Sequence, residues 1–377
     1  MVPPALGIYG GPPLRNWFRA ERFHPVIEAL NMTEGLRDLR GLTRPEIEAA
    51  LAELGEKPSH AAAVFMAVHR KGAADPAALP GLPPRVGAAL ARAFFISPRA
   101  AAAERQVSRD GTQKLLLRFP DGAPAECVVL PAKGRQAACL SSQSGCACGC
   151  TFCATGALGL RRSLTAPEIV DQFEACREAA GGTLNSLVFM GMGEPFLNWE
   201  AVKRAVLILS DSRGRHFPQA KMTVSTVGVI PVIEELAASD LKVRLALSVV
   251  AADPVQREAM VPMERTYPIE KAVAAVRAYC RAKQALVMFE YILFPGVNDR
   301  PEDSARLAAL VGDIPCRVNL IPYNPPGGPG GETPRVKAFQ KELIAAGVRT
   351  YLRLERGADI AAACGQLAAG AGGGDGR

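Results

Sequence analysis

The sequence has no long apolar run and few aromatic or histidine side chains. No stretch of 18 or more uninterrupted apolar residues occurs in its 377 residues, which excludes a membrane-spanning helix. The first residues show no basic segment followed by an apolar one, so we expect no secretory signal and a cytoplasmic location. Aromatic residues make up only 6% of the chain. The four histidines lie away from the cysteine-rich segment described below, so we expect no mixed Cys/His zinc site.

The composition is that of a folded protein with a sizeable core. Hydrophobic residues make up 49% and charged residues 21% of the chain, which excludes wholesale disorder. The length corresponds to two or three domains of ordinary size. The net charge of +7 is compatible with an anionic partner such as nucleic acid, although many enzymes with neutral substrates carry as much.

The pattern of apolar residues divides the chain into four parts. We predict a helical accessory domain over residues 1–100 and a β-hairpin extension over 101–136, in which two apolar stretches flank Asp121-Gly122. A repeating β/α domain follows over 137–367, and the small, glycine-rich tail 368–377 is predicted to be flexible.

Three helices are predicted in the first part. Thr43 and Glu46 have the spacing of a capping box at the start of the first helix, and Gly55 ends it. The others are expected at 61–69 and 85–95.

Short apolar runs alternate with amphipathic stretches over the third part. Such β/α repeats predict a parallel sheet, either in a barrel or in a doubly wound fold. Ligands of these folds sit at the carboxyl ends of the strands, and glycine-containing turns follow several of the apolar runs. The predicted strands are 186–190, 222–225, 243–249, 287–293 and 317–321, and the predicted helices are 167–179, 199–210, 229–238, 269–282 and 303–311.

The ten cysteines are the most informative part of the composition. Six of them lie between Cys127 and Cys153. A disulfide scaffold does not fit a long chain with its own core and no export signal, and clustered thiols in a reducing compartment indicate a metal or catalytic site. Within the segment, the pattern C-x3-C-x2-C is formed by Cys146, Cys150 and Cys153.

This pattern allows two kinds of metal site. Three thiolates on one loop can hold three irons of a [4Fe–4S] cluster and leave the fourth iron open to a substrate. A structural zinc site would instead recruit Cys148 or Cys139 as its fourth ligand. A third interpretation is a set of unrelated buried thiols, and the spacing favours the cluster over both.

Six motifs spread over the chain point to one family. They are Cys139-Leu-Ser-Ser-Gln-Ser-Gly-Cys146, Cys150-Thr-Phe-Cys153-Ala-Thr-Gly156, Phe189-Met-Gly-Met-Gly-Glu-Pro195, Val224-Ser-Thr-Val-Gly228, Val318-Asn-Leu-Ile-Pro-Tyr-Asn-Pro325 and Asp359-Ile-Ala-Ala-Ala-Cys-Gly-Gln-Leu367. In this order they resemble the RlmN/Cfr family of radical S-adenosylmethionine (SAM) RNA methyltransferases. The match runs from about residue 42 to 367, which is nearly the whole chain.

The resemblance implies a fold of the α/β class and an activity. The fold would be a partial (β/α)6 radical-SAM barrel with the helical accessory domain and the β-hairpin extension. The activity would be methylation of an adenine carbon, C2 or C8, in 23S ribosomal RNA at the peptidyl-transferase centre, with tRNA as a further substrate. Glu194-Pro195 favours C2.

The resemblance also implies cofactors and partners. A [4Fe–4S] cluster and SAM would be the cofactors, flavodoxin or ferredoxin would supply electrons, and the protein would act as a monomer. An alternative is a metal-stabilised RNA-binding paralogue without catalysis.

Single residues receive roles through the same resemblance. Cys364 would carry a methyl group from one SAM, and a 5′-deoxyadenosyl radical from a second SAM would take a hydrogen atom from this S-methylcysteine. The resulting methylene would bond to the adenine carbon. Cys139 would then release the RNA by forming a disulfide with Cys364, and Glu126 would accept a proton. The cluster would be held by Cys146, Cys150 and Cys153.

The SAM contacts implied by the resemblance lie at the ends of the barrel strands. The family shows Ser-Leu-His where this chain reads Ser248-Val249-Val250, and because valine cannot hydrogen-bond we expect one fewer polar contact to SAM. The residues that would meet SAM are Gly193, Glu194, Ser225, Ser248, Val249, Val250 and Asn324.

Basic residues outside these motifs are candidates for contacts to RNA phosphates, although such charges are more often solvated surface. They are Arg161, Arg162, Arg213, Arg215, Arg353 and Arg356.

Overall fold

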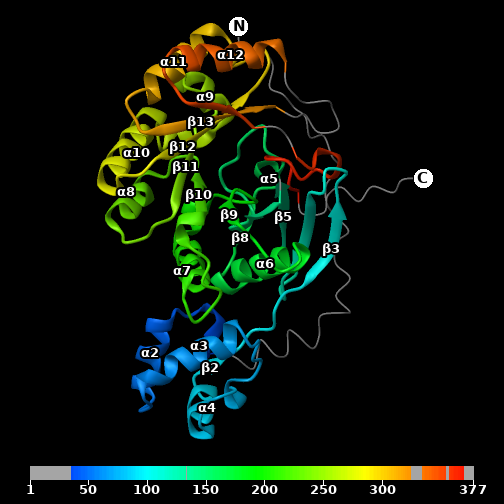
Figure 1. The fold of residues 1–377 in the computed structure, drawn as a ribbon, viewed down its shortest axis with the longest axis vertical. Helices are drawn as coiled ribbons and strands as arrows, with labels where there is room; N and C mark the ends of the chain where they lie inside the picture. The colour runs from blue at the N-terminus through cyan, green and yellow to red at the C-terminus, as the bar shows by residue number, and fades with distance from the viewer. Residues whose placement is uncertain (1–34, 133, 324–332, 354–355, 369–377) are drawn as a thin grey trace, which may run out of the picture.

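A computed structural model describes residues 35–132, 134–323, 333–353 and 356–368 (Figure 1). The predicted site residue Asn324 lies outside these ranges, as does all of the predicted tail after its first residue. Among the described residues, no helix combines the length and the apolar character needed to cross a membrane.

A small helical module precedes the rest of the described chain. Its helices are α2 (Arg44–Glu53), α3 (Ala61–His69) and α4 (Pro84–Ala91). The predicted capping box is present, and Glu46 accepts a hydrogen bond of 2.8 Å from the Thr43 backbone N–H. The third helix ends earlier than predicted, because Phe94–Phe95 forms a short strand, β2, parallel to β1 (Arg37–Asp38), and the Phe94 side chain is buried in the core.

A ten-stranded sheet forms the centre of the structure after the helical module. Its order is β14-β13-β12-β11-β10-β9-β6-β5-β4-β3. Neighbours from β6 to β14 are parallel, which confirms the predicted partial barrel. The parallel strands are β6 (Arg135–Leu140), β9 (Ser186–Phe189), β10 (Met222–Thr226), β11 (Arg244–Ser248), β12 (Val287–Leu293), β13 (Cys316–Pro322) and β14 (Thr350–Leu352).

Amphipathic helices connect the parallel strands and surround them in Figure 1. Five of them, α6, α7, α8, α10 and α11, lie within two residues of their predicted positions, because each buries one face against the sheet. Helices α9 and α12 were not predicted. Helix α6 begins at a capping box in which Glu168 accepts a hydrogen bond of 2.8 Å from the Thr165 N–H. The helices are α6 (Ala166–Ala179), α7 (Trp199–Ser210), α8 (Ile230–Ala238), α9 (Pro254–Met260), α10 (Ile269–Lys283), α11 (Pro301–Val311) and α12 (Pro334–Ala345).

The predicted hairpin extends the barrel sheet. Strands β4 (Gln113–Arg118) and β5 (Pro124–Ala132) are antiparallel around the predicted turn, and β3 (Ala102–Val107) pairs with β4 at the edge. Strand β5 also pairs with the first barrel strand, β6, with Val128 opposite Cys139. The extension is therefore continuous with the barrel strand that carries one of the predicted catalytic cysteines.

Charged contacts join the helical module to the barrel helices. Arg44 bonds Asp211 at 3.0 Å, and Arg204 on α7 donates to the Gly41 carbonyl at 3.1 Å. A buried ion pair joins Arg40 of the module to Asp171 on α6. One hydrophobic cluster also includes residues of both parts. The domain limits at 100 and 136 stay predictions.

Candidate active site

Two adjoining cavities open at the carboxyl ends of the parallel strands. The cluster cavity, of about 160 Å³, is lined by the three motif cysteines, Glu194 and Ser225 among others. The thiol cavity, of about 210 Å³, is lined by Cys139 and the end of β5. The two share a wall that includes Phe152, Met190, Ile292, Arg353 and Cys364.

The motif cysteines sit on the cluster loop, residues 146–159, which a two-stranded antiparallel sheet closes at its base. The two strands are β7 (Gln143–Gly145) and β8 (Leu160–Ser163). Gly145 has φ +82°, and a Cβ added there would meet the Gly159 carbonyl oxygen at 1.9 Å. Only glycine allows the two strands to approach so closely.

The three thiols lie around one cavity and influence one another. Burial raises the pKa of the Cys150 thiol, and charge on Cys153 and Cys146 raises it further. Burial also raises the pKa of Cys153. The pKa of Cys146 is lowered, chiefly by a hydrogen bond from the buried Cys148 thiol, and the Cys148 N–H approaches Cys146 Sγ at 3.5 Å. Cys148 therefore supports Cys146 by hydrogen bonding.

This donor set fits an iron–sulfur cluster. Within the described ranges, no three His, Cys, Asp or Glu side chains converge on a single ion position, which is the arrangement that a mononuclear zinc site requires. Three cysteines spread around one wall, with open space facing them, suit a cluster that binds each thiolate through a different iron.

Gly193 and Glu194 line the same cavity close to the cysteines, and the charge of Glu194 acts on Cys146, Cys148 and Cys150. Gly193 has φ +93°, and a Cβ there would lie 2.5 Å from the Gln143 Cβ. The Glu194 carboxylate is buried and accepts hydrogen bonds of 2.9 Å from the N–H groups of Phe196 and Val227. Burial raises the pKa of Glu194 to about 7. A carboxylate held this way is suited to an ammonium group.

Polar side chains follow two neighbouring strands at the same edge. Ser225 on β10 and Ser248 on β11 line the cluster cavity with their Oγ atoms 3.3 Å apart. Val250 lines it too, with φ +65°, a conformation that costs a β-branched residue free energy. Val249 departs from expectation, because its side chain points into the hydrophobic core and does not line the cavity. Val249 continues the alternation of β11, in which Leu247 is also buried in the core while Ser248 lines the cavity.

Cys364 is carried by a C-terminal segment, residues 356–368, that docks on the cluster loop. The Gly365 carbonyl accepts a hydrogen bond of 2.7 Å from the Ala154 N–H, and the Leu367 carbonyl accepts one of 2.7 Å from Thr155 Oγ1. The Cys364 side chain is exposed and lies on the wall shared by both cavities.

Cys139 lies on β6 across the thiol cavity from this segment. Burial and, to a smaller extent, charge on Cys364 raise its pKa to about 12, against the opposing effect of Arg353. The fold thus brings together two cysteines that are far apart in the sequence.

Glu126 lies beside the C-terminal segment. Its carboxylate accepts a hydrogen bond of 2.9 Å from the Ala368 N–H and pairs with Lys114 at 3.4 Å. It is buried on β5 and is not among the residues that line either cavity.

Comparison with known proteins gives a consistent match. The model of the radical SAM superfamily matches residues 140–308. The dual-specificity RNA methyltransferase RlmN of Rhodospirillum rubrum is 42% identical over 343 residues, covering 88% of this chain and 80% of that protein. The protein of the same name from Anaeromyxobacter dehalogenans strain 2CP-C is 41% identical and covers 90% of this chain and 94% of that protein. The chain belongs to the RlmN family of radical SAM RNA methyltransferases.

A solved structure agrees with this assignment. The crystal structure of a radical SAM methyltransferase from Sphaerobacter thermophilus matches with a TM-score of 0.79 and 42% identity, covering 88% of this chain and 99% of that one. The chain is therefore an enzyme of this class, with a [4Fe–4S] cluster and SAM as the cofactors of the RlmN family. The family assignment therefore favours an iron–sulfur enzyme over the structural zinc site and the non-catalytic paralogue.

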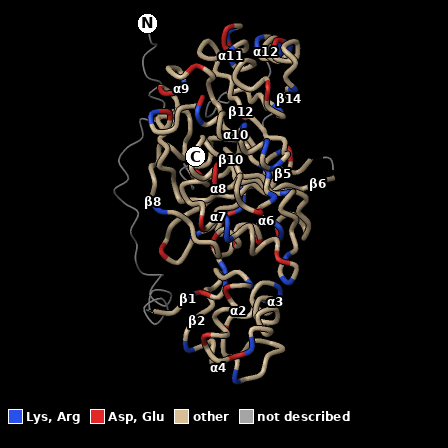
Figure 2. The backbone as a smooth tube through the Cα atoms, turned by 90° about the vertical axis from the view of Figure 1, so that its left-hand side faces the viewer, with Lys and Arg blue, Asp and Glu red and all other residues tan. Residues whose placement is uncertain are grey.

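The arginines proposed as phosphate contacts are largely engaged with the protein itself. Both signs of charge are interspersed in the helical module and in the barrel (Figure 2). Five of the six candidates contact carboxylates or backbone carbonyls; these are Arg161, Arg162, Arg215, Arg353 and Arg356. Contacts of these arginines to RNA stay predictions.

Sequence reasoning missed the Glu290–Arg353 pair at the shared wall. The sequence predicts Arg353 only as a contact to RNA phosphates. In the structure its guanidinium lies 3.6 Å from the Glu290 carboxylate, and its charge acts on both cysteines of the thiol cavity. The signal was available, because Glu290 is a charged residue in the middle of the apolar strand β12, and such a residue at the centre of a buried strand indicates a functional or paired charge.

Proposed function

We propose that this chain methylates C2 of an adenine in 23S ribosomal RNA at the peptidyl-transferase centre, with tRNA as a second substrate. The observation that carries the proposal is the position of Cys364 on the wall shared by the cluster cavity and the thiol cavity. A methyl carrier must reach the cofactors on one side and the RNA base on the other. The term dual-specificity in the names of the relatives supports more than one class of RNA.

The cofactors occupy the cluster cavity in this proposal. When bound, the cluster and SAM supply a radical able to take a hydrogen atom from a methyl group. Glu194 would bind the SAM ammonium group, and Ser225 with Ser248 would meet its polar edge. Val249 would act through its backbone, since its side chain is in the core. The cluster ligands would be Cys146, Cys150 and Cys153, and the remaining SAM contacts Gly193, Val250 and Asn324.

The thiol cavity receives the adenine. Cys364 would carry the methyl group, and loss of one hydrogen atom would leave a methylene that bonds to the adenine carbon. The radical formed by this addition would pass one electron to the cofactors. The Cys139 thiolate would then attack the Cys364 sulfur, so that a disulfide forms as the bond between that sulfur and the methylene breaks, and the methylene carbon would take up a proton to become the methyl group of the released RNA. Glu126 would accept the proton lost from the adenine carbon. Because Glu126 now bonds Ala368, this step requires movement of the C-terminal segment.

The proposed reaction also requires an electron donor. Reduction of the cluster requires a one-electron donor, for which we propose flavodoxin or ferredoxin. We also propose that the protein acts as a monomer in the cytoplasm, where its RNA substrates are found.

Mass spectrometry of nucleosides from purified 23S ribosomal RNA and tRNA tests the proposal. Cells with the gene should contain 2-methyladenosine in both RNAs, and cells without it should lack this nucleoside. Appearance of 8-methyladenosine would transfer the assignment to the C8 reaction. Identical nucleosides from both strains would contradict methylation of these RNAs altogether.

A further inference from the structure

The base of the cluster loop is hydrogen-bonded to the turn between β4 and β5, in the hairpin extension. The loop leaves at β7 and returns at β8, so the β7–β8 pair sets where its cysteines point. Ser144 on β7 donates a hydrogen bond of 2.7 Å to the Pro124 carbonyl at the start of β5. Arg161 on β8 donates hydrogen bonds of 3.1 Å to the carbonyls of Asp121 and Gly122. The β4–β5 turn, residues 121–124, therefore supports the base of the loop.

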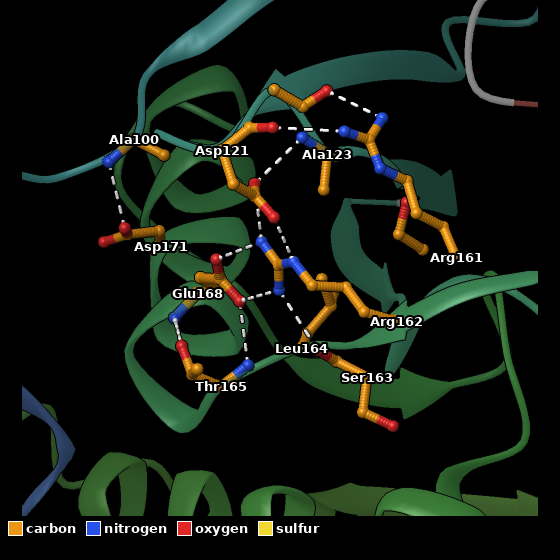
Figure 3. A network of polar contacts seen from close by, with 12 residues as sticks. Ala100, Asp121, Ala123, Arg161, Arg162, Ser163, Leu164, Thr165, Glu168 and Asp171 are labelled. Atoms are coloured by element: carbon orange, nitrogen blue, oxygen red, sulfur yellow. Dashed lines mark hydrogen bonds and ion pairs between the residues drawn. The ribbon is translucent and has the colours of Figure 1, made fainter. Parts of the chain in front are cut away.

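Arg162 on β8 joins this turn to helix α6 (Figure 3). Its guanidinium contacts both Asp121 carboxylate oxygens, one of them at 2.9 Å through Nη2. It also bonds both oxygens of Glu168, at 2.7 Å and 2.8 Å, and so reaches the first turn of α6. The guanidinium carbon lies 5.6 Å from the centre of the Phe119 ring.

The two carboxylates that bind Arg162 are each held by further hydrogen bonds. Glu168 closes the capping box of α6, and Asp121 accepts a hydrogen bond of 2.9 Å from the Ala123 N–H (Figure 3). Burial alone would raise the pKa of Asp121, but the hydrogen bonds from Arg162 and Ala123 lower it. The guanidinium therefore sits between two held carboxylates, and bidentate pairs of this kind define orientation as well as position.

We propose that Arg162 is a positioning residue for the iron–sulfur cluster, which holds the base of the cluster loop against the β4–β5 turn and α6. Arg162 would act on the cysteines through the β7–β8 pair at which the loop begins and ends, in the way that supporting hydrogen bonds around a metal site orient its ligands and set how well they retain the metal. The alternative role, a contact to an RNA phosphate, would require the same guanidinium donors that now bind Asp121 and Glu168. The proposal depends on the cluster and not on which adenine carbon is methylated.

The test compares Arg162→Gln with Arg277→Gln in reconstituted full-length protein. Arg277 on α10 forms a similar two-bonded pair, at 2.7 Å and 2.9 Å, with Asp313 in the turn after α11, and neither residue belongs to the cluster loop or to its β7–β8 base. We expect Arg162→Gln to lose its visible iron–sulfur absorption to a chelator about three- to tenfold faster than wild type, and Arg277→Gln to lose it at the wild-type rate. In the cluster-free proteins, limited proteolysis should cut within residues 146–159 faster in Arg162→Gln alone.

RNA binding by the same proteins distinguishes the two roles. Unchanged RNA affinity together with faster cluster loss supports the proposal. Lower affinity with a salt dependence reduced by about one charge, and with wild-type cluster retention, would overturn it. If Arg162→Gln does not fold, Asp121→Asn removes the same contact from the other side and should give the same cluster loss. Arg162→Lys keeps the charge without the two-bonded geometry and should recover only part of the retention. Wild-type retention in both Arg162→Gln and Asp121→Asn contradicts the proposal.

Discussion

Cys364 and Cys139 are 225 positions apart in the sequence (364 − 139) and line the same cavity, one on the C-terminal segment and the other on the first parallel strand. The Arg353 guanidinium lies on the wall between the two cavities and lowers the pKa of Cys139, which burial and Cys364 raise. One thiol is exposed to the cluster cavity and the other is buried. The arrangement separates a methyl carrier from the thiol that would act after it.

The first prediction concerns the charge on Cys139. Replacing Arg353 by glutamine removes the cation that lowers the pKa of this thiol, so its pKa should rise. At a fixed pH less thiolate is then present, and alkylation of Cys139 by iodoacetamide should slow by several-fold. Peptide mass spectrometry gives the rate. Arg356→Gln, at another position on the same cavity, is the control and should react as wild type. Equal rates in all three proteins would contradict a role for Arg353.

The second prediction concerns the metal. Anaerobically purified protein should carry about four irons per chain, as a [4Fe–4S] cluster requires. Cys146→Ala should lose most of this iron, because it removes a ligand. Cys148→Ala should retain about four irons, because the Cys148 thiol only donates a hydrogen bond to Cys146. Iron analysis and visible spectra give the result. One zinc per chain, lost on substitution of Cys148, would instead indicate the structural zinc site.

The third prediction concerns the strained backbone at Val250. Histidine adopts positive φ more readily than a β-branched residue, so Val250→His should stabilise the cluster-free protein by up to about 1–2 kcal/mol. Its ring can also add one hydrogen bond to SAM, worth about 0.5–1.5 kcal/mol, so SAM binding should tighten or stay unchanged. Thermal unfolding and calorimetry measure the two effects. Val250→Ile keeps the strain and should show neither gain. Weaker SAM binding by Val250→His would mean that the cavity is fitted to valine.

The fourth prediction concerns the buried His69. Burial lowers its pKa from 6.5 to about 3, with nearby arginines adding to the shift. The unfolded chain takes up a proton below pH 6.5 while the folded chain does not until about pH 3. The associated stability is therefore complete above pH 6.5 and is lost as the pH falls from 6.5 to 3. Between pH 7 and pH 5 His69 should cost about 2 kcal/mol of unfolding free energy. His69→Leu should lose less stability over this interval in urea titrations; an equal loss would show that His69 does not titrate this way.

Much of the fold could be predicted because it depends on local patterns. The capping boxes at Thr43 and Thr165, and the periodicity of the barrel helices, are set by neighbouring residues. The cysteine spacing predicts three thiols on one loop, whereas the β7–β8 pair that closes this loop was not predicted. Pairing of β5 with β6 could not be predicted in this way, because a hairpin signal does not say which further strand lies beside it.

The parts of the site that sequence reasoning placed differently depend on tertiary contacts. Arg162 reads as surface charge until the fold brings the β4–β5 turn to it. Val249 is predicted as a SAM contact because it lies between Ser248 and Val250, but its side chain is buried in the hydrophobic core. Glu290 meets Arg353 only because β14 carries the chain back to the shared wall.

The two cysteines provide the most direct test of the account. Cys364→Ala removes the methyl carrier, so it should abolish methylation and form no covalent complex with RNA. Cys139→Ala removes only the thiol that acts after the carbon–carbon bond exists, so it should accumulate a protein–RNA adduct that survives denaturant and that nuclease trims to a nucleotide-tagged protein. Denaturing gel electrophoresis of both variants after incubation with substrate RNA is the measurement. An adduct with Cys139→Ala alone is the predicted result, whereas full turnover by Cys139→Ala, or an adduct with Cys364→Ala, would contradict the roles assigned to this pair.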